Sequence, residues 1–321
     1  MEPELVRVDP TRPRLRSRVV PHSLAGWLVV LLVAVIVAGA LGAGAIATDT
    51  FGAGRLFERL QDKMDRILAG PPPDRATLPT VEVTEPPEDS PSATPTPPPG
   101  ESGKPPPTPA PTPTPIPRVA VDVDIVAHHG PEFAHEIRVD WCSPAGVTTA
   151  LAILGLGAPT DDRQREIAHR VGEWESYQDS HNGEWGPAAM ALALKAYGAD
   201  GYQVVAYQTR PLALRAAAKA IMQTNSPAIL LAWRGAHTWV MTGFRADADP
   251  TVFKDAKVTG AYIDDPWYPD ISSIWGPSDK PGTFQDASEM VRNFLPWKRP
   301  EGTYPARDGK FIVLIPTIRR G

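Results

Sequence analysis

Cys142 is the only cysteine in the chain, and its surroundings favour a reactive thiol. Pro144 suits the first turn of a helix, so the following residues predict a helix with Cys142 at its N-terminus. At that position the helix dipole and free N–H groups stabilise a thiolate, which attacks carbonyl carbon. The alternative is a small buried hydrophobic side chain, the usual state of a free cysteine.

A thiolate nucleophile needs a base that is also a proton donor, and histidine serves both roles near neutral pH. Of seven histidines, His237 follows the small residues Gly235 and Ala236 where a turn enters a predicted strand. Asp265 ends the next strand, before Pro266, and could accept a hydrogen bond from the imidazole to fix its tautomer. The plainer alternatives are a core or surface histidine and a turn-forming aspartate.

Three other groups of residues were weighed for binding roles. One crowds the segment before the cysteine: His128, His129, Glu132, His135 and Glu136. It has no spacing typical of a metal site. Another is acidic: Asp247, Asp249 and Asp255. It lacks the calcium-loop pattern and indicates a solvated loop, so we expect no metal and no other cofactor. Finally, Trp267 and Tyr268 follow Asp265 and are the best candidates to line a substrate cleft.

Elements that position these residues are predicted from periodicity, capping residues and β-branched runs. Helices are expected at 144–154, from Asp161 or Asp162 to about 171, at 187–197 and at 211–223. Strands are expected at 119–126, 202–206, 228–233, 238–244, 258–263 and 311–315. Because helices come first and strands later, the order favours an α+β fold of two layers, with a helical layer carrying Cys142 packed on a mostly antiparallel sheet carrying His237 and Asp265.

The N-terminal part predicts a membrane-anchored protein. Residues 24–48 contain no ionisable side chain and are long enough for a transmembrane helix. The Arg-rich tail 1–23 places the N-terminus in the cytoplasm, so the rest of this single-pass protein is extracellular. A cleaved signal peptide and a secreted protein are the alternative, because small residues such as Ala43 and Ala45 suit cleavage.

The segment between membrane and domain is expected to hold the domain away from the lipid surface. Residues 49–70 predict an amphipathic juxtamembrane helix, and residues 71–118 a disordered Pro/Thr-rich stalk. The stalk holds 19 of the 38 prolines and could span on the order of 100 Å as polyproline II, which suits crossing a cell wall. Residues 119–321 form the globular domain. Net charge is -5 with no basic run after residue 20, so nucleic acid is not expected as a partner.

Four motifs resemble those of the papain-like cysteine peptidases, in particular the bacteriocin-processing, double-glycine-leader peptidase-like domains and their secreted relatives. The motifs cover about residues 119–314. They are Cys142-Ser143-Pro144-Ala145, the histidine strand 235–244, Asp264-Asp265-Pro266-Trp267 and Asn182-Gly183-Glu184-Trp185. The resemblance implies the papain-like fold, with Cys142 as nucleophile, His237 as general base and acid, and Asp265 as the orienting carboxylate.

One position departs from the family pattern. Members often have a glutamine six residues before the cysteine that donates to the oxyanion, and here that residue is Glu136. A carboxylate would repel the developing charge, whereas a protonated Glu136 or nearby His135 could donate. The resemblance therefore implies a cysteine peptidase acting on a peptide or protein, and the predicted anchor and stalk would place it outside the membrane with a substrate near the cell wall. An amidase or transpeptidase would use the same residues, and an inactive module binding cell-wall peptide or glycan is the alternative.

Overall fold

The computed structural model describes residues 24–48, 50, 53, 57, 60, 64, 81–84, 116–176, 178–179, 185–272, 274–298 and 304–319. The chain divides into two units, Met1–Lys63 and Met64–Gly321. The first contains helix α1 (Leu24–Ala47), of which Trp27–Ile46 is long and apolar enough to be a membrane span or a signal sequence. This confirms the predicted apolar helix. The tail 1–23 and nearly all of 49–70 lie outside the described residues.

Five α-helices and two 3-10 helices are described in the second unit. They are α3 (Cys142–Ile153), α4 (Asp161–His169), η2 (Val171–Glu173), α5 (Pro187–Ala196), α6 (Arg210–Thr224), η4 (Trp233–Gly235) and α7 (Ala287–Asn293). Thr209 caps α6 by accepting from the Leu212 N–H. The cap of α4 is Thr160 rather than Asp161 or Asp162, because its hydroxyl accepts from the Arg163 N–H. Helix α7 was not predicted from the sequence, and Asp286 caps it by accepting from the Ser288 and Glu289 N–H groups.

The larger sheet has the order β1-β3-β10-β4-β5-β6-β9, with β2 paired to β5. Its strands are β1 (Val81–Val83), β2 (Val121–Asp124), β3 (Tyr202–Tyr207), β4 (Ala228–Ala232), β5 (His237–Ala246), β6 (Val258–Asp264), β9 (Thr283–Asp286) and β10 (Phe311–Pro316). All of these pairs are antiparallel except β1 with β3. A separate hairpin joins β7 (Ile271–Ser272) to β8 (Gly276–Pro277). The unit is thus α+β with a mostly antiparallel sheet, as predicted.

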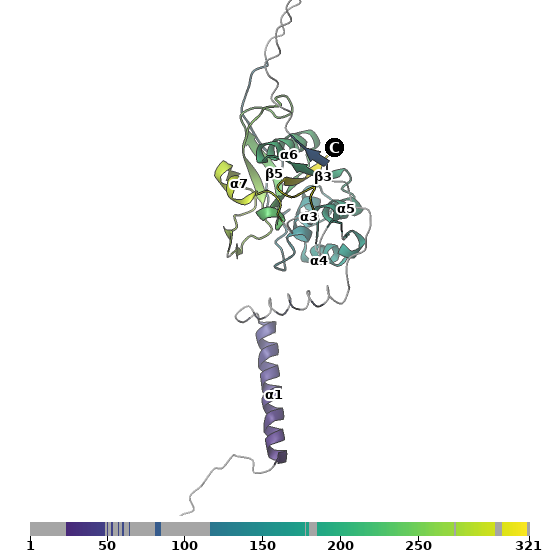
Figure 1. Ribbon diagram of the computed structural model, residues 1–321, viewed down its shortest axis with the longest axis vertical. Coiled ribbons are helices and arrows are strands. Elements are labelled where there is room, and N and C mark those ends of the chain that lie inside the picture. The colour runs from purple at the N-terminus through teal and green to yellow at the C-terminus, as the bar shows by residue number, and fades with distance from the viewer. Residues whose placement is uncertain are drawn as a thin grey trace, which may run out of the picture. The chain divides into compact units, whose positions relative to one another are not determined.

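Helices cover both faces of this sheet, so the expectation of two layers is wrong. Along β4, Leu230 packs in a core cluster with α6, while Ile229 and Leu231 pack in a second cluster with α3 and α5. Figure 1 shows α6 on one side of the sheet and α3 and α5 on the other. Because alternate side chains point to opposite faces of a strand, a fully apolar strand such as β4 needs cover on both sides.

Strand β1 lies within the predicted stalk, so disorder throughout 71–118 is wrong at Val81–Val83. Val81 aligns with Val205 and Val83 with Tyr207, and Val83 packs against the core. The alternate residue, Glu82, forms an ion pair with Lys310 and accepts a hydrogen bond from Gln208. The sequence analysis did not predict this strand, because Val81–Val83 is short and lies among prolines. Residues 71–80 and 85–115 lie outside the described residues.

Val83→Ala is expected to lower the free energy of unfolding of the domain by about 1 kcal/mol, because its side chain packs on the core. Val81, which is 46% exposed, is the matched control. Val81→Ala should change the free energy of unfolding by less than about 0.5 kcal/mol. Urea denaturation of both variants measures the difference. Equal effects of the two substitutions would mean that β1 does not pack as described.

Candidate active site

His237 and Asp265 form a buried hydrogen-bonded pair. His237 begins β5, and Asp265 directly follows β6, the antiparallel neighbour of β5. His237 Nε2 lies 2.6 Å from Asp265 Oδ1, and the residues are 3% and 5% exposed. The Trp267 N–H also donates to Asp265 Oδ1 at 2.9 Å, which fixes the carboxylate within its turn. The pairing leaves the other ring nitrogen of His237 available to a second partner.

That second partner is Cys142, which is the first residue of α3 and is partly exposed. Among the described residues, no side chain caps the N-terminus of α3. Burial opposes ionisation of the thiol, but hydrogen bonds with His237 and Thr238 outweigh it and lower the pKa of Cys142. Burial likewise opposes the imidazolium, yet Asp265 and Cys142 raise the pKa of His237 well above its ordinary value. Both shifts favour a thiolate–imidazolium pair.

Helix α3 packs closely on the start of β5. A Cβ atom on Gly146 would lie 2.5 Å from Thr238 Cγ2, so a larger side chain would push the helix away. The hydroxyls of Ser143 and Thr238 hydrogen-bond at 3.1 Å. These contacts hold the N-terminus of α3, with Cys142, beside His237. The sequence signal for this contact was the small residue one turn after the cysteine, which we did not use.

Glu136 completes the cluster. Its carboxyl group, the Cys142 Sγ and a His237 ring nitrogen lie within 4.8 Å of one another. Glu136 is 3% exposed, and neither carboxyl oxygen has a hydrogen-bond partner among the described residues. Burial, and then the nearby Cys142 thiolate, raise the pKa of Glu136 to about 10 despite the opposing charge of His237. The side chain is therefore a neutral acid at physiological pH, with an O–H group to donate.

Aromatic rings surround the imidazole. Trp233 stacks on His237 with 4.1 Å between ring centroids, and Trp275 stacks on Trp233 at 5.6 Å. Trp267, predicted to line a substrate cleft, meets the imidazole edge-on at 6.5 Å. The ring of Tyr268 contacts Phe133 at 6.4 Å, and no ring contact between Tyr268 and His237 is described. Sequence reasoning missed Trp233, which a turn after β4 brings to the imidazole, and Trp275 reaches Trp233 from the β7–β8 hairpin.

The predicted histidine- and glutamate-rich segment does not come together as one cluster. His129 contacts two aspartates, His135 Nδ1 lies 2.7 Å from the Tyr268 carbonyl oxygen, and Glu136 alone joins Cys142 and His237. Glutamate, cysteine and histidine are also donor types that zinc prefers, so a chelator belongs in every assay of this site. In the predicted acidic loop, Asp247 and Asp255 both pair with Arg118.

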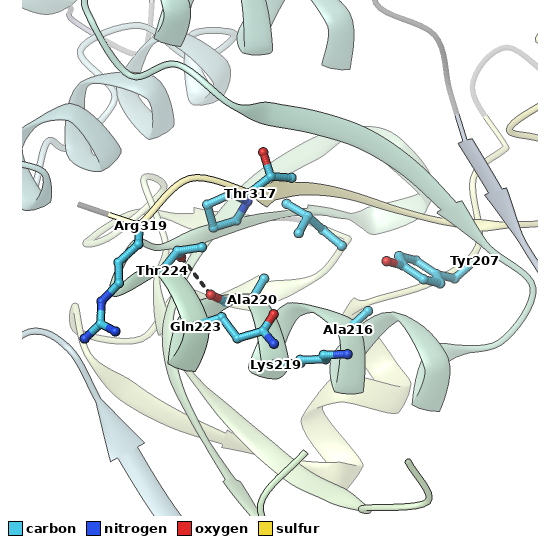
Figure 2. A pocket seen from close by; sticks show the side chains of 10 residues that line it. Tyr207, Ala216, Lys219, Ala220, Gln223, Thr224, Thr317 and Arg319 are labelled. Atoms are coloured by element: carbon cyan, nitrogen blue, oxygen red, sulfur yellow. Dashed lines mark hydrogen bonds between the residues drawn. The ribbon is translucent and has the colours of Figure 1, made fainter. Parts of the chain in front are cut away.

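A cavity of about 390 Å³ lies elsewhere, between α6 and the end of β10 (Figure 2). Its lining includes Tyr207, Lys219, Gln223 and Arg319. No residue of the Cys142 cluster lines it, and we assign it no role.

The fold and the cluster together define a class: an α+β domain with a cysteine, a histidine and an aspartate in contact. Comparison with known proteins adds little to this description. No protein-family description matches the chain, and no curated protein matches it significantly. One similar solved structure is the crystal structure of a double glycine motif protease from an AMS/PCAT transporter, in complex with the leader peptide. It is 16% identical with a TM-score of 0.33, covering 61% of this chain and 99% of that chain.

Proposed function

We propose that this protein is a thiol hydrolase, most specifically a cysteine peptidase, with Cys142, His237 and Asp265 as its catalytic residues. The observation that carries the proposal is the position of the His237 imidazole, which contacts Cys142 on one side and Asp265 on the other. This arrangement is what a thiolate nucleophile requires: a proton donor for the leaving group, and an acceptor that fixes the donor's tautomer.

In the proposed reaction, the Cys142 thiolate attacks the peptide carbonyl carbon, and a C–S bond forms. The carbonyl oxygen becomes an oxyanion, which accepts hydrogen bonds from the Cys142 N–H and the neutral Glu136 carboxyl group. His237 gives its proton to the leaving amine as the C–N bond breaks. The imidazole then takes a proton from water, which attacks the thioester and restores the thiolate. The Trp233 ring covers the imidazole and limits its contact with solvent.

We further propose that helix α1 anchors the protein in the membrane, with the catalytic domain outside the cell. A peptide or protein near the cell wall is the proposed substrate. The competing proposal is an inactive module that binds such a ligand, and it is favoured by Glu136, where related domains often have glutamine. Activity measurements on Cys142 variants separate these two functions.

The test is cleavage of a peptide library by the full chain in detergent, with EDTA present to exclude metal effects. We expect cleavage by the native protein, a thioester of Cys142 detectable by mass spectrometry, and no cleavage by Cys142→Ala. Absence of both cleavage and thioester in a correctly folded native protein would contradict the hydrolase. Peptides bound equally well by the native protein and Cys142→Ala, without cleavage, would identify a binding module.

A further inference from the structure

Two segments carry the two carboxyl groups of the site, Glu136 and Asp265, and they are joined at three points. Loop A, residues 125–141, contains Glu136 and leads into Cys142; loop B, residues 264–270, contains Asp265. The Glu136 N–H donates to the Pro266 carbonyl oxygen at 2.9 Å, and His135 contacts the Tyr268 carbonyl oxygen. The third link is ionic and joins His129 of loop A to Asp264 of loop B. The mechanism proposed above does not use it.

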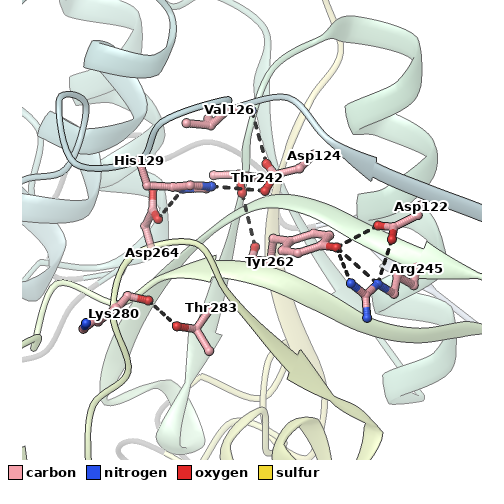
Figure 3. Close-up of polar contacts among 10 residues, drawn as sticks. All are labelled: Asp122, Asp124, Val126, His129, Thr242, Arg245, Tyr262, Asp264, Lys280 and Thr283. Carbon is pink, nitrogen blue, oxygen red and sulfur yellow. Dashed lines mark hydrogen bonds and ion pairs between the residues drawn. The ribbon is translucent and has the colours of Figure 1, made fainter.

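His129 lies between two carboxylates (Figure 3). Its Nδ1 is 2.8 Å from Asp264 Oδ1, and its Nε2 is 3.1 Å from Asp124 Oδ2. Both ring nitrogens face carboxylate oxygens, which accept hydrogen bonds, so two ionised aspartates pair best with an imidazolium that carries a proton on each nitrogen. Burial opposes that charge, but the two aspartates raise the pKa of His129 to about 10. The ring is therefore charged throughout the physiological range.

The ionisation of the Asp264 carboxyl group depends on the His129 imidazolium. Its side chain is 0% exposed, and its second carboxyl oxygen has no hydrogen-bond partner among the described residues. Burial raises the pKa of Asp264 above its ordinary value, although His129 and the Gly282 N–H oppose the shift. An isolated carboxylate in such a place is costly. The imidazolium thus stabilises the ionised form of a residue that is adjacent in the chain to Asp265.

The ring of His129 packs tightly against the backbone at Gly282. A Cβ atom on Gly282 would lie 2.3 Å from His129 Cδ2, and Gly282 has a positive φ of +77°. The Gly282 N–H in turn donates to the Ile263 carbonyl oxygen at 3.0 Å. The imidazolium therefore packs against the end of β2, the end of β6 and the turn before β9. Such packing leaves little freedom for the backbone of residues 263–265.

We propose that His129 is a positioning residue: by binding the Asp264 carboxylate, it fixes the backbone from which Asp265 reaches His237. Successive side chains at the end of a strand point to opposite sides, so Asp264 faces His129 while Asp265 faces the imidazole of His237. A misplacement of about 1 Å in a catalytic group can cost on the order of 100-fold in rate. This positioning role rests on the proposed function, because His129 acts through Asp265 and His237.

The experiment measures Cys142 alkylation by iodoacetamide against pH in the full chain, together with kcat and KM on any cleaved peptide. In His129→Gln we expect alkylation at pH 6 to fall by about tenfold and kcat by about tenfold to 100-fold, with KM unchanged. Asp124→Asn is the matched control, because it removes the outer partner of His129 and leaves Asp264 paired. The alkylation rate at pH 6 and the kcat of Asp124→Asn should both stay within about threefold of the native values.

A second variant covers the case in which His129→Gln does not fold. His129→Gln/Asp264→Asn removes both charges, leaves no unpaired buried carboxylate, and should show the same slower alkylation at pH 6. A native alkylation profile in either folded variant would overturn the role of His129. A native protein whose thiol has an ordinary pKa would instead contradict the proposed function, so the two failures are distinguishable.

Discussion

His237→Ala is expected to slow alkylation of Cys142 at pH 6 by about 100-fold and peptide cleavage by about 1,000-fold. In the native protein the imidazole lowers the pKa of the Cys142 thiol, so a larger fraction of it is ionised at that pH than in a free thiol. Without the imidazole, burial still opposes ionisation of Cys142, and only the hydrogen bonds with Thr238 remain to favour the thiolate. Cleavage falls further because the leaving amine also loses its proton donor.

Alkylation followed by mass spectrometry from pH 5 to pH 10 measures the effect on the thiol. His169→Ala is the matched control: this exposed histidine of α4 contacts Trp141, the neighbour of Cys142, and should leave the profile unchanged. Thermal unfolding establishes that both variants fold. If the midpoint of alkylation is the same with and without His237, Cys142 is not activated by the imidazole and the proposed mechanism is wrong.

Glu136→Gln is expected to raise the free energy of unfolding by about 2–3 kcal/mol at pH 7. The unfolded carboxyl group has an ordinary pKa of 4.5, whereas the folded one has a pKa of about 10. Between these values the folded protein holds a proton that the unfolded chain releases, so stability falls as pH rises, by about 1.4 kcal/mol per unit. Glutamine is neutral at every pH and removes this cost.

Urea denaturation at pH 4, 7 and 9 measures the difference, which should be small at pH 4 and grow toward pH 9. Asp162→Asn, at a side chain 96% exposed, is the control and should differ by less than about 1 kcal/mol at each pH. Activity gives a second readout: glutamine keeps a donor for the oxyanion, whereas Glu136→Ala should lose about 100-fold. A stability difference that does not change with pH would show that Glu136 is not a buried neutral acid.

Local patterns predicted the elements that carry the candidate site. Pro144 placed Cys142 at the first residue of α3, and Pro266 marked the end of β6 just before Asp265. His237 was expected at the beginning of a strand because Gly235 and Ala236 precede it, and the structure has it there. Each of these signals lies within a few residues of the side chain that it positions, so sequence spacing was enough.

Contacts between distant residues could not be predicted in the same way. His129 and Asp264 are 135 residues apart, and no periodic pattern links them. Trp275 reaches Trp233 only through the β7–β8 hairpin, which sequence analysis did not resolve. The apolar run of β4 indicated a buried strand but not that helices would cover both faces. Glu136 was identified by its place before Cys142, while its protonation depends on burial that only the fold creates.

Strand β1 also has a mechanical consequence. Strands β1 and β2 belong to the same sheet, so a pull on the chain ahead of Val81 is borne first by the β1–β3 hydrogen bonds and the Glu82–Lys310 ion pair. Detachment of β1 would transfer the load to β2, which pairs with β5. The length of chain between the point of pulling and the sheet would then depend on the applied force.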